Sequence, residues 1–276
     1  MSQNHQLQNP VSENNTMKSF LSGDAYIHFK ATDIVAGRKT LIFVNSLGTD
    51  FRIWRDVVER LRPHFNIVLH DKRGHGLSTF GTAPHKIETY AQDLAALLDR
   101  LNVKSAITVG LSVGGLIVQS LFHTRPDLVA KLVISNSALK IGNEQSWGQR
   151  IAVVEGAGLE SIADTVMKMW FAPEFHQQAP EELSLYRTML ARSFPAGYIA
   201  CCNALRDADF TGRAKDINVP TLFIAGTHDG STPPALVEAS AGLIPGSSFK
   251  LVEGVAHIPC VEQPEVYASL LREFAS

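Results

Sequence analysis

The most informative stretch of the chain is AITVGLSVGG, residues 106–115. Its first five residues predict a buried strand, and the residues after the serine continue as the apolar run VGGLIVQSLF, which predicts a helix. A hydroxyl therefore stands where a strand turns sharply into a helix, with small residues at Gly110 and Gly114 that let the two elements pack closely. This setting gives the pattern Gly-x-Ser-x-Gly its weight, because such an elbow presents the serine Oγ clear of the backbone. We interpret Ser112 as a nucleophile; the alternative is a serine that caps a helix.

Short apolar, β-branched runs alternate with amphipathic segments along most of the chain. Residues 88–102 illustrate the second kind, with leucines spaced along one helical face. The later apolar runs are nearly continuous, as strands buried on both faces of a parallel sheet require. The alternation predicts an α/β, mostly parallel, doubly wound sheet. The predicted strands are 26–29, 40–45, 66–70, 106–110, 131–135, 221–226 and 248–252.

The alternation stops over residues 139–207, where we find only helix-like segments before Pro220 opens the next strand. An all-helical insertion between two strands of a parallel sheet predicts a cap. The predicted core then comprises residues 17–138 and 208–276. Residues 1–16 are polar and rich in Asn, Gln and Ser, so we expect a disordered leader, with Met17 as a candidate functional start.

A serine nucleophile needs a base, and the base needs an orienting acid. His257 lies in EGVAHIPCVEQP, between the last predicted strand and the final helix, and Asp229 directly follows the strand 221–226. The chain order Ser112, Asp229, His257 is the one found in Gly-x-Ser-x-Gly hydrolases. All three residues follow the carboxyl ends of strands, where open α/β sheets place their sites. A loop histidine and a turn aspartate are the structural alternatives. The rival acid position after the strand 131–135 holds Asn136, which is not a carboxylate.

The oxyanion that forms during acyl transfer needs two backbone N–H donors. We predict the N–H of Val113, which follows the nucleophile, and that of Leu47, in the loop SLGTD after the strand 40–45. The motif DKRGHG follows a different strand. We therefore interpret its Asp71 and His75 as structural, and we expect Arg73 to pair locally.

The amino-acid composition limits the kinds of partner and the cellular location that we expect for the protein. Of 276 residues, 45% are hydrophobic and 19% charged, and the formal net charge is −2, so nothing suggests a nucleic-acid or membrane-surface partner. The three cysteines, Cys201, Cys202 and Cys260, have neither disulfide-framework nor metal-site spacing, and we expect packed thiols. No apolar stretch has the length of a membrane span, and the N-terminus lacks the features of a secretory signal. We expect a cytoplasmic protein.

From Met17 to the end the chain resembles the α/β-hydrolases, and within them the 3-oxoadipate enol-lactone hydrolases. The resemblance rests on DKRGHGLS, GLSVGGLIVQ, MWF and GTHDGSTPP, and most specifically on NSLG, SWxxRI and CCxALRDxD. Val113 departs from the methionine frequent in relatives, although only its backbone N–H matters. The polar leader has no counterpart.

The resemblance implies hydrolysis of the enol-lactone of 3-oxoadipate, in the β-ketoadipate branch of aromatic catabolism, without a metal or organic cofactor. Such a lactone is a small anion, so a capped pocket should hold a cation or several donors for its carboxylate. Trp147 and Arg150 share a helical face and Trp170 ends the next helix, which makes these three candidate substrate-binding residues. They can equally be two core tryptophans and a solvated arginine.

Two other readings stay open at this point. The first is a different serine hydrolase on the same scaffold: a general carboxylesterase, a C–C bond hydrolase or a perhydrolase. The second is a non-catalytic ligand-binding member of the superfamily that keeps the pocket as a receptor. No feature of the sequence indicates an oligomeric state.

Overall fold

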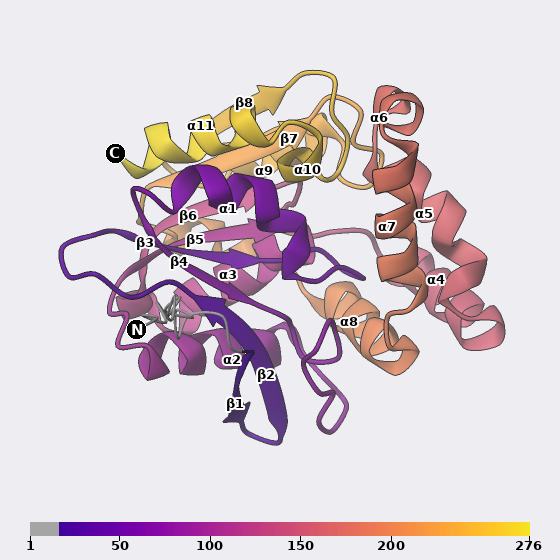
Figure 1. Ribbon diagram of the computed structural model, residues 1–276, viewed down its shortest axis with the longest axis horizontal. Coiled ribbons are helices and arrows are strands. Elements are labelled where there is room, and N and C mark those ends of the chain that lie inside the picture. The colour runs from indigo at the N-terminus through magenta and orange to yellow at the C-terminus, as the bar shows by residue number, and fades with distance from the viewer. Residues whose placement is uncertain (1–16) are drawn as a thin grey trace, which may run out of the picture.

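A computed structural model describes residues 17–276 (Figure 1), so the predicted leader, residues 1–16, lies outside the described residues. Eight strands form one sheet in the order β1-β2-β4-β3-β5-β6-β7-β8. From β4 through β8 every neighbouring pair is parallel, and β1 and β2 add an antiparallel edge. The predicted α/β class with a mostly parallel sheet is confirmed.

The seven predicted strands are all present, and each residue of β3, β4, β5 and β7 is buried. The first strand, β1, was not predicted because only Phe20 and Ser22 of its five residues are buried, which leaves no apolar run to detect. The strands are β1 (Lys18–Ser22), β2 (Ala25–Ala31), β3 (Thr40–Val44), β4 (Asn66–His70), β5 (Ala106–Leu111), β6 (Val129–Ser135), β7 (Thr221–Gly226) and β8 (Ser248–Val252).

Helices cover both faces of the sheet, which explains the burial of the central strands on both sides. In Figure 1, α1 (Arg55–Leu61) and α11 (Pro264–Ala275) pack together in front of the sheet, and α2 (Ile87–Arg100) and α3 (Val113–Thr124) pack together behind it. Three shorter helices complete the core: α9 (Pro234–Gly242), against β7 and β8, α10 (Pro259–Glu262), against α11, and the 3-10 helix η2 (Phe51–Trp54), after β3. Two further 3-10 turns are η3 (Pro126–Leu128) and η5 (Thr211–Asp216).

All the helices between β6 and β7 stand at one end of the sheet, on the right of Figure 1, where the parallel strands point. Residues 139–207, all of them described, contain no strand. The 3-10 helix η4 (Leu159–Ile162) directly precedes α5. The helices are α4 (Glu144–Ala157), α5 (Ala163–Trp170), α6 (Pro173–Gln178), α7 (Pro180–Ala191) and α8 (Pro195–Asp207).

Helix α8 lies directly on the loop that follows β4. A Cβ atom at Gly197 would overlap the carbonyl group of Gly74, and Gly74 has a φ of +71°, a conformation that favours glycine. Two glycines thus allow backbone-to-backbone contact between the helical segment and the core. Cys201, one turn further along the same face of α8, is fully buried.

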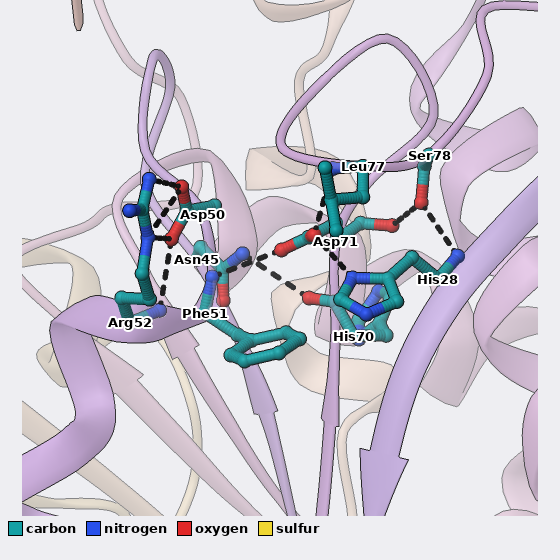
Figure 2. A network of polar contacts seen from close by, with 9 residues as sticks. All are labelled: His28, Asn45, Asp50, Phe51, Arg52, His70, Asp71, Leu77 and Ser78. Carbon is teal, nitrogen blue, oxygen red and sulfur yellow. Dashed lines mark hydrogen bonds and ion pairs between the residues drawn. The ribbon is translucent and has the colours of Figure 1, made fainter. Parts of the chain in front are cut away.

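Asp71 organises the loop after β4 (Figure 2). Its Oδ1 accepts a hydrogen bond from the Phe51 N–H at 3.0 Å, and its Oδ2 accepts one from the Leu77 N–H at 3.0 Å. The ring Nδ1 of His28, from β2, lies 2.8 Å from the same Oδ2. Asp71 therefore joins three segments that are distant in sequence, which agrees with its interpretation as a structural residue.

Arg73 does not pair locally, so that expectation is wrong. Its guanidinium donates two hydrogen bonds of 2.7 Å to Asp93, in α2, and one of 3.1 Å to Asp24. These partners are 20 and 49 residues away. The tight turn of the loop points the arginine side chain into the core beside α2, and a buried guanidinium needs a carboxylate there.

We predict that Arg73→Met lowers the free energy of unfolding by about 3–5 kcal/mol, because Asp93 would stay buried without its cation. Urea denaturation at pH 7 measures this loss. The double variant Arg73→Met/Asp93→Leu, which removes both charges, should recover a large part of it. A loss below about 1 kcal/mol for Arg73→Met would contradict a structural role for the pair.

Candidate active site

Ser112 occupies a strained elbow between β5 and α3. Its φ of 58° and ψ of −120° are rare for a residue with a side chain, and surrounding contacts hold them in place. The Ser112 N–H donates to the carbonyl oxygen of Ser135 at 2.9 Å. The Ser112 carbonyl oxygen accepts hydrogen bonds from the hydroxyl of Ser137 at 2.7 Å and the N–H of Gly115 at 2.8 Å.

The glycines around the elbow are required by close backbone contacts. A Cβ at Gly110 would overlap the carbonyl of Gly114, and a Cβ at Gly114 would overlap the carbonyl of Val44, in β3. Close packing of the backbone therefore explains why both outer positions of the Gly-x-Ser-x-Gly pattern are glycine. The third, Gly115, packs in the same way against the Ser137 side chain.

Asp229 and His257 are joined directly. The His257 Nδ1 lies 2.9 Å from the Asp229 Oδ2, and both residues are 3% exposed. The Asp229 Oδ1 accepts hydrogen bonds from the N–H groups of Ser231 and Thr232, and the Thr232 hydroxyl donates to Oδ2 at 2.7 Å. Burial alone would raise the pKa of Asp229, but the adjacent His257 and the hydrogen bonds from His257 and Thr232 outweigh it and lower that pKa. Asp229 is therefore held as a carboxylate that orients the imidazole.

Asn136 is a site residue that the sequence analysis missed. Its Nδ2 donates to the Asp229 Oδ2 at 2.9 Å and to the carbonyl oxygen of Ala256 at 3.0 Å. The asparagine has a positive φ of 46° and follows β6, between the strands that carry Ser112 and Asp229. In the sequence this position is distinguished only by its lack of a carboxylate. Its place at the carboxyl end of a central strand was the signal that it belonged to the site.

The loop of His257 is anchored to the helical segment above it. The N–H groups of His257 and Ile258 both donate to the carbonyl oxygen of Trp170, at 3.1 and 3.2 Å. The Glu262 carboxylate accepts hydrogen bonds from the N–H of Ala172 at 2.8 Å and the N–H of Ala256 at 2.7 Å. The end of α5 and the histidine loop are thus fastened together at two points.

Ser112 lies at the same edge of the sheet, after β5, whereas Asp229 follows β7 and His257 follows β8. Among the hydrogen bonds within residues 17–276, none joins the Ser112 hydroxyl to His257. Bonds of this kind often tighten only when substrate binds. The Nδ1 contact to Asp229 leaves the Nε2 of His257 available for the serine.

The N–H groups of the two predicted oxyanion donors are available for hydrogen bonding. Ser46 to Thr49 form a tight turn in which Gly48 has a φ of +73°, and the Leu47 N–H makes no hydrogen bond to any described residue. Val113 is the first residue of α3, so its N–H has no partner within the helix. Both groups are free to bind an oxygen atom at the carboxyl edge of the sheet.

The three candidate substrate-binding residues differ in their surroundings. The Trp147 Nε1 donates to the Ile141 carbonyl oxygen at 2.7 Å, and Trp170 is buried. The half-buried Arg150 forms no ion pair with a described carboxylate, and its Nη1 lies 3.3 Å from the hydroxyl of Tyr198. The Tyr198 ring in turn packs beside Gly48, 3.1 Å from where a Cβ would stand. Arg150 is therefore connected through Tyr198 to the turn that holds Leu47.

No three His, Cys, Asp or Glu side chains in residues 17–276 are grouped so that they could hold a metal ion. The cysteines are buried free thiols, as predicted, and burial raises the pKa of Cys201 to about 11. Within the same residues no helix combines the length and apolar character needed to cross a membrane.

Comparison with known proteins agrees with this geometry. The family described as the alpha/beta hydrolase fold matches residues 39–264. The chain belongs to the α/β hydrolase family. Two curated relatives of this α/β hydrolase are 3-oxoadipate enol-lactonase 2 and 3-oxoadipate enol-lactonase 1 of Acinetobacter baylyi, at 35% and 30% identity. The alignments cover 84% and 85% of this chain and 86% and 87% of those proteins.

A solved structure gives the same result. The enol-lactonase from Burkholderia xenovorans LB400 superposes on this α/β hydrolase with a TM-score of 0.90 and 29% sequence identity. The superposition covers 94% of this chain and 99% of that one. The resemblance predicted from the sequence is confirmed, and the protein is a hydrolase by family.

Glu262 generates a prediction about stability and pH. Burial, with smaller contributions from Asp229 and Glu174, raises its pKa from 4.5 to about 7 despite the two hydrogen bonds it accepts. A carboxyl with a higher pKa in the folded chain stabilises the fold fully below its unfolded pKa, and this contribution is lost as the pH rises to about 7. The stability advantage of wild type over Glu262→Gln should therefore shrink by roughly 1–2 kcal/mol between pH 5 and pH 8.

Urea denaturation of both proteins at several pH values measures this change. Glu253→Gln, at an exposed carboxylate four residues before His257, is the matched control and should show no such trend. A wild-type advantage over Glu262→Gln that is constant, or that grows with pH, would contradict the assignment.

Proposed function

We propose that this α/β hydrolase opens the enol-lactone of 3-oxoadipate by acyl transfer through Ser112, His257 and Asp229. The observation that carries the proposal is the buried 2.9 Å contact between His257 and Asp229, at the sheet edge that also holds the strained Ser112 elbow. The similarity to two enol-lactonases supports the choice of substrate.

The first half of the proposed reaction forms an ester with the enzyme. The Nε2 of His257 removes the proton of Ser112, and the Oγ attacks the lactone carbonyl carbon. The carbonyl oxygen becomes an oxyanion that accepts hydrogen bonds from the N–H groups of Leu47 and Val113. The carbon–oxygen bond of the ring then breaks. Its oxygen leaves as an enolate, which takes the proton from His257 and needs less acid assistance than an alkoxide.

The second half releases the product. His257 removes a proton from water, the hydroxide attacks the acyl carbon, and the bond to the Ser112 Oγ breaks as the serine regains its proton. The product is an enol acid, which tautomerises to the 3-oxo acid. Asp229 holds the imidazole in one tautomer and stabilises its protonated form throughout.

We predict that Ser112→Ala and His257→Ala each lower kcat by at least about 10⁴-fold, and that Asp229→Asn has a milder effect. Because the residues act as one unit, the double variant Ser112→Ala/His257→Ala should be little worse than either single variant. Steady-state kinetics on the enol-lactone measure these effects. Retention of a tenth of the wild-type rate by Ser112→Ala would contradict the nucleophile assignment.

Arg150 is proposed as the partner of the substrate carboxylate. It carries a guanidinium without a carboxylate partner among the described residues, and Tyr198 connects it to the turn of Leu47. Trp147 and Trp170, from the same helical segment, are proposed to line the apolar part of the pocket. A small anionic lactone would then be bound by its carboxylate while its carbonyl oxygen meets the oxyanion donors.

Arg150→Ala should raise KM for the anionic enol-lactone by roughly 10- to 100-fold, because the substrate carboxylate would lose its ion pair with the guanidinium. The KM for the neutral ester p-nitrophenyl acetate should stay within twofold, because this ester has no charge to pair with Arg150. Arg187→Ala is a matched control: this arginine, on α7, pairs with Asp164 and Glu160 and should have no effect on either substrate. Equal losses on both substrates would point to damaged packing and contradict the assignment.

The alternatives are separated by one comparison of substrates. A general carboxylesterase would prefer simple esters to the enol-lactone in kcat/KM, whereas the proposed enzyme prefers the lactone. A C–C bond hydrolase would turn over neither well, and a perhydrolase would, like a carboxylesterase, act on the simple esters. A non-catalytic ligand-binding protein would bind the lactone without consuming it.

A further inference from the structure

The carbonyl oxygen of Ser46 receives three hydrogen bonds. The Nζ of Lys72 donates to it at 2.8 Å, and Thr49 donates to it twice, from its hydroxyl at 2.9 Å and from its N–H at 3.3 Å. This carbonyl and the N–H of Leu47 belong to the same peptide group. The donors therefore act on the peptide whose other end is the candidate oxyanion donor.

Lys72 is an unusual residue for this position because it is 1% exposed. It lies in the loop after β4, under helix α8, where Gly197 contacts Gly74 and where Cys201 is close enough to influence the Lys72 charge. Burial of an ammonium group is unfavourable unless a carboxylate pairs with it. Among residues 17–276 no carboxylate forms an ion pair with the Lys72 Nζ.

The nearby acidic groups are engaged elsewhere. Asp71 accepts hydrogen bonds from Phe51, Leu77 and His28, and Asp50 pairs with Arg52 at 2.6 Å (Figure 2). The Ser46 carbonyl is thus the one hydrogen-bond acceptor of Lys72 within the described residues. The buried ammonium of Lys72, which has no carboxylate partner among the described residues, therefore acts on a single peptide group.

We propose that Lys72 is a positioning residue for acyl transfer, which holds the Ser46–Leu47 peptide in place and polarises it so that the Leu47 N–H binds the oxyanion more strongly. This inference rests on the proposed serine chemistry. Hydrogen bonds in a chain strengthen one another, and a charged donor at one end of a peptide makes the N–H at the other end a better donor. The gain appears in the transition state, where the oxyanion forms.

Protonation of Lys72 gives this inference a signature in pH. Burial lowers the pKa of Lys72 to about 8, against the opposing effects of Cys201, Asp71 and Asp50. Burial first, and the Lys72 charge second, also lower the pKa of His70 and His75, so both rings are neutral in this range. Lys72 is charged below about pH 8, and its effect on the peptide should be lost as the pH rises through that value.

The test compares wild type with Lys72→Met, which keeps the length of the side chain and removes its charge, on p-nitrophenyl acetate and on the enol-lactone. At pH 7 we expect kcat to fall roughly tenfold and KM to change less than twofold. The ratio of wild-type to variant kcat should fall at least threefold between pH 7 and pH 9.5. Wild type loses rate over this range and Lys72→Met does not.

Lys131→Met is the matched control, because the Lys131 Nζ also donates to a backbone carbonyl, that of Phe274, at 2.7 Å, but lies on β6 away from the site edge. It should keep wild-type kcat and the wild-type pH profile. A thermal melt of each variant checks folding. Should Lys72→Met unfold, the alkaline fall of wild-type kcat around pH 8 still tests the inference.

Three outcomes overturn the inference: an unchanged kcat in Lys72→Met, a ratio to wild type that is constant with pH, or a wild-type kcat that is flat from pH 7 to 9.5. If Ser112→Ala is inactive in the same assays, these outcomes leave the proposed function standing. If the enzyme hydrolyses the ester but not the lactone, the ester assay still tests the role of Lys72. Full activity of Ser112→Ala on the ester would remove the serine chemistry and this inference with it.

Discussion

The backbone of Ser112 is held in a conformation that residues with side chains rarely adopt, and the rest of the site depends on that constraint. The absence of side chains at Gly110 and Gly114 lets β5, α3 and β3 pack closely, and the hydroxyl of Ser137, in the loop after β6, donates to the carbonyl oxygen of Ser112. The same packing starts α3 directly after the serine and leaves the Val113 N–H unpaired. One strained turn therefore presents both the proposed nucleophile and one of the two proposed oxyanion donors.

The core and its helical insertion both contact the segments that form the candidate site. The carbonyl of Trp170 and the carboxylate of Glu262 fasten the end of α5 to the loop of His257, and α8 contacts the loop of Lys72 through Gly197. Movement of the helices would thus displace both the loop of His257 and the loop of Lys72. Ligand sites are common where two packed parts of a protein meet.

The features that could be predicted from the sequence are those that depend on residues close together in the chain. Short runs rich in apolar residues predicted the strands from β2 to β8, and the strand–turn–helix setting predicted the elbow at Ser112. The sequence could not predict β1, whose exposed edge has no apolar run, nor the partners of Arg73, which are set by how a loop crosses α2. Asn136 and Lys72 were missed for the same reason. Their roles depend on contacts with Asp229 and Ser46, which lie far away in the chain and meet only at the sheet edge.

The central claim, that Ser112 carries the chemistry on the lactone, can be tested by titration with a serine-directed fluorophosphonate. Lactone hydrolysis and the mass of the chain are followed in the same samples, and the modified residue is located by peptide mass spectrometry. The account predicts that one equivalent per chain abolishes hydrolysis in proportion to labelling, with the added mass on Ser112. Inactivation with the label on another residue, or undiminished hydrolysis by a chain labelled on Ser112, would contradict it.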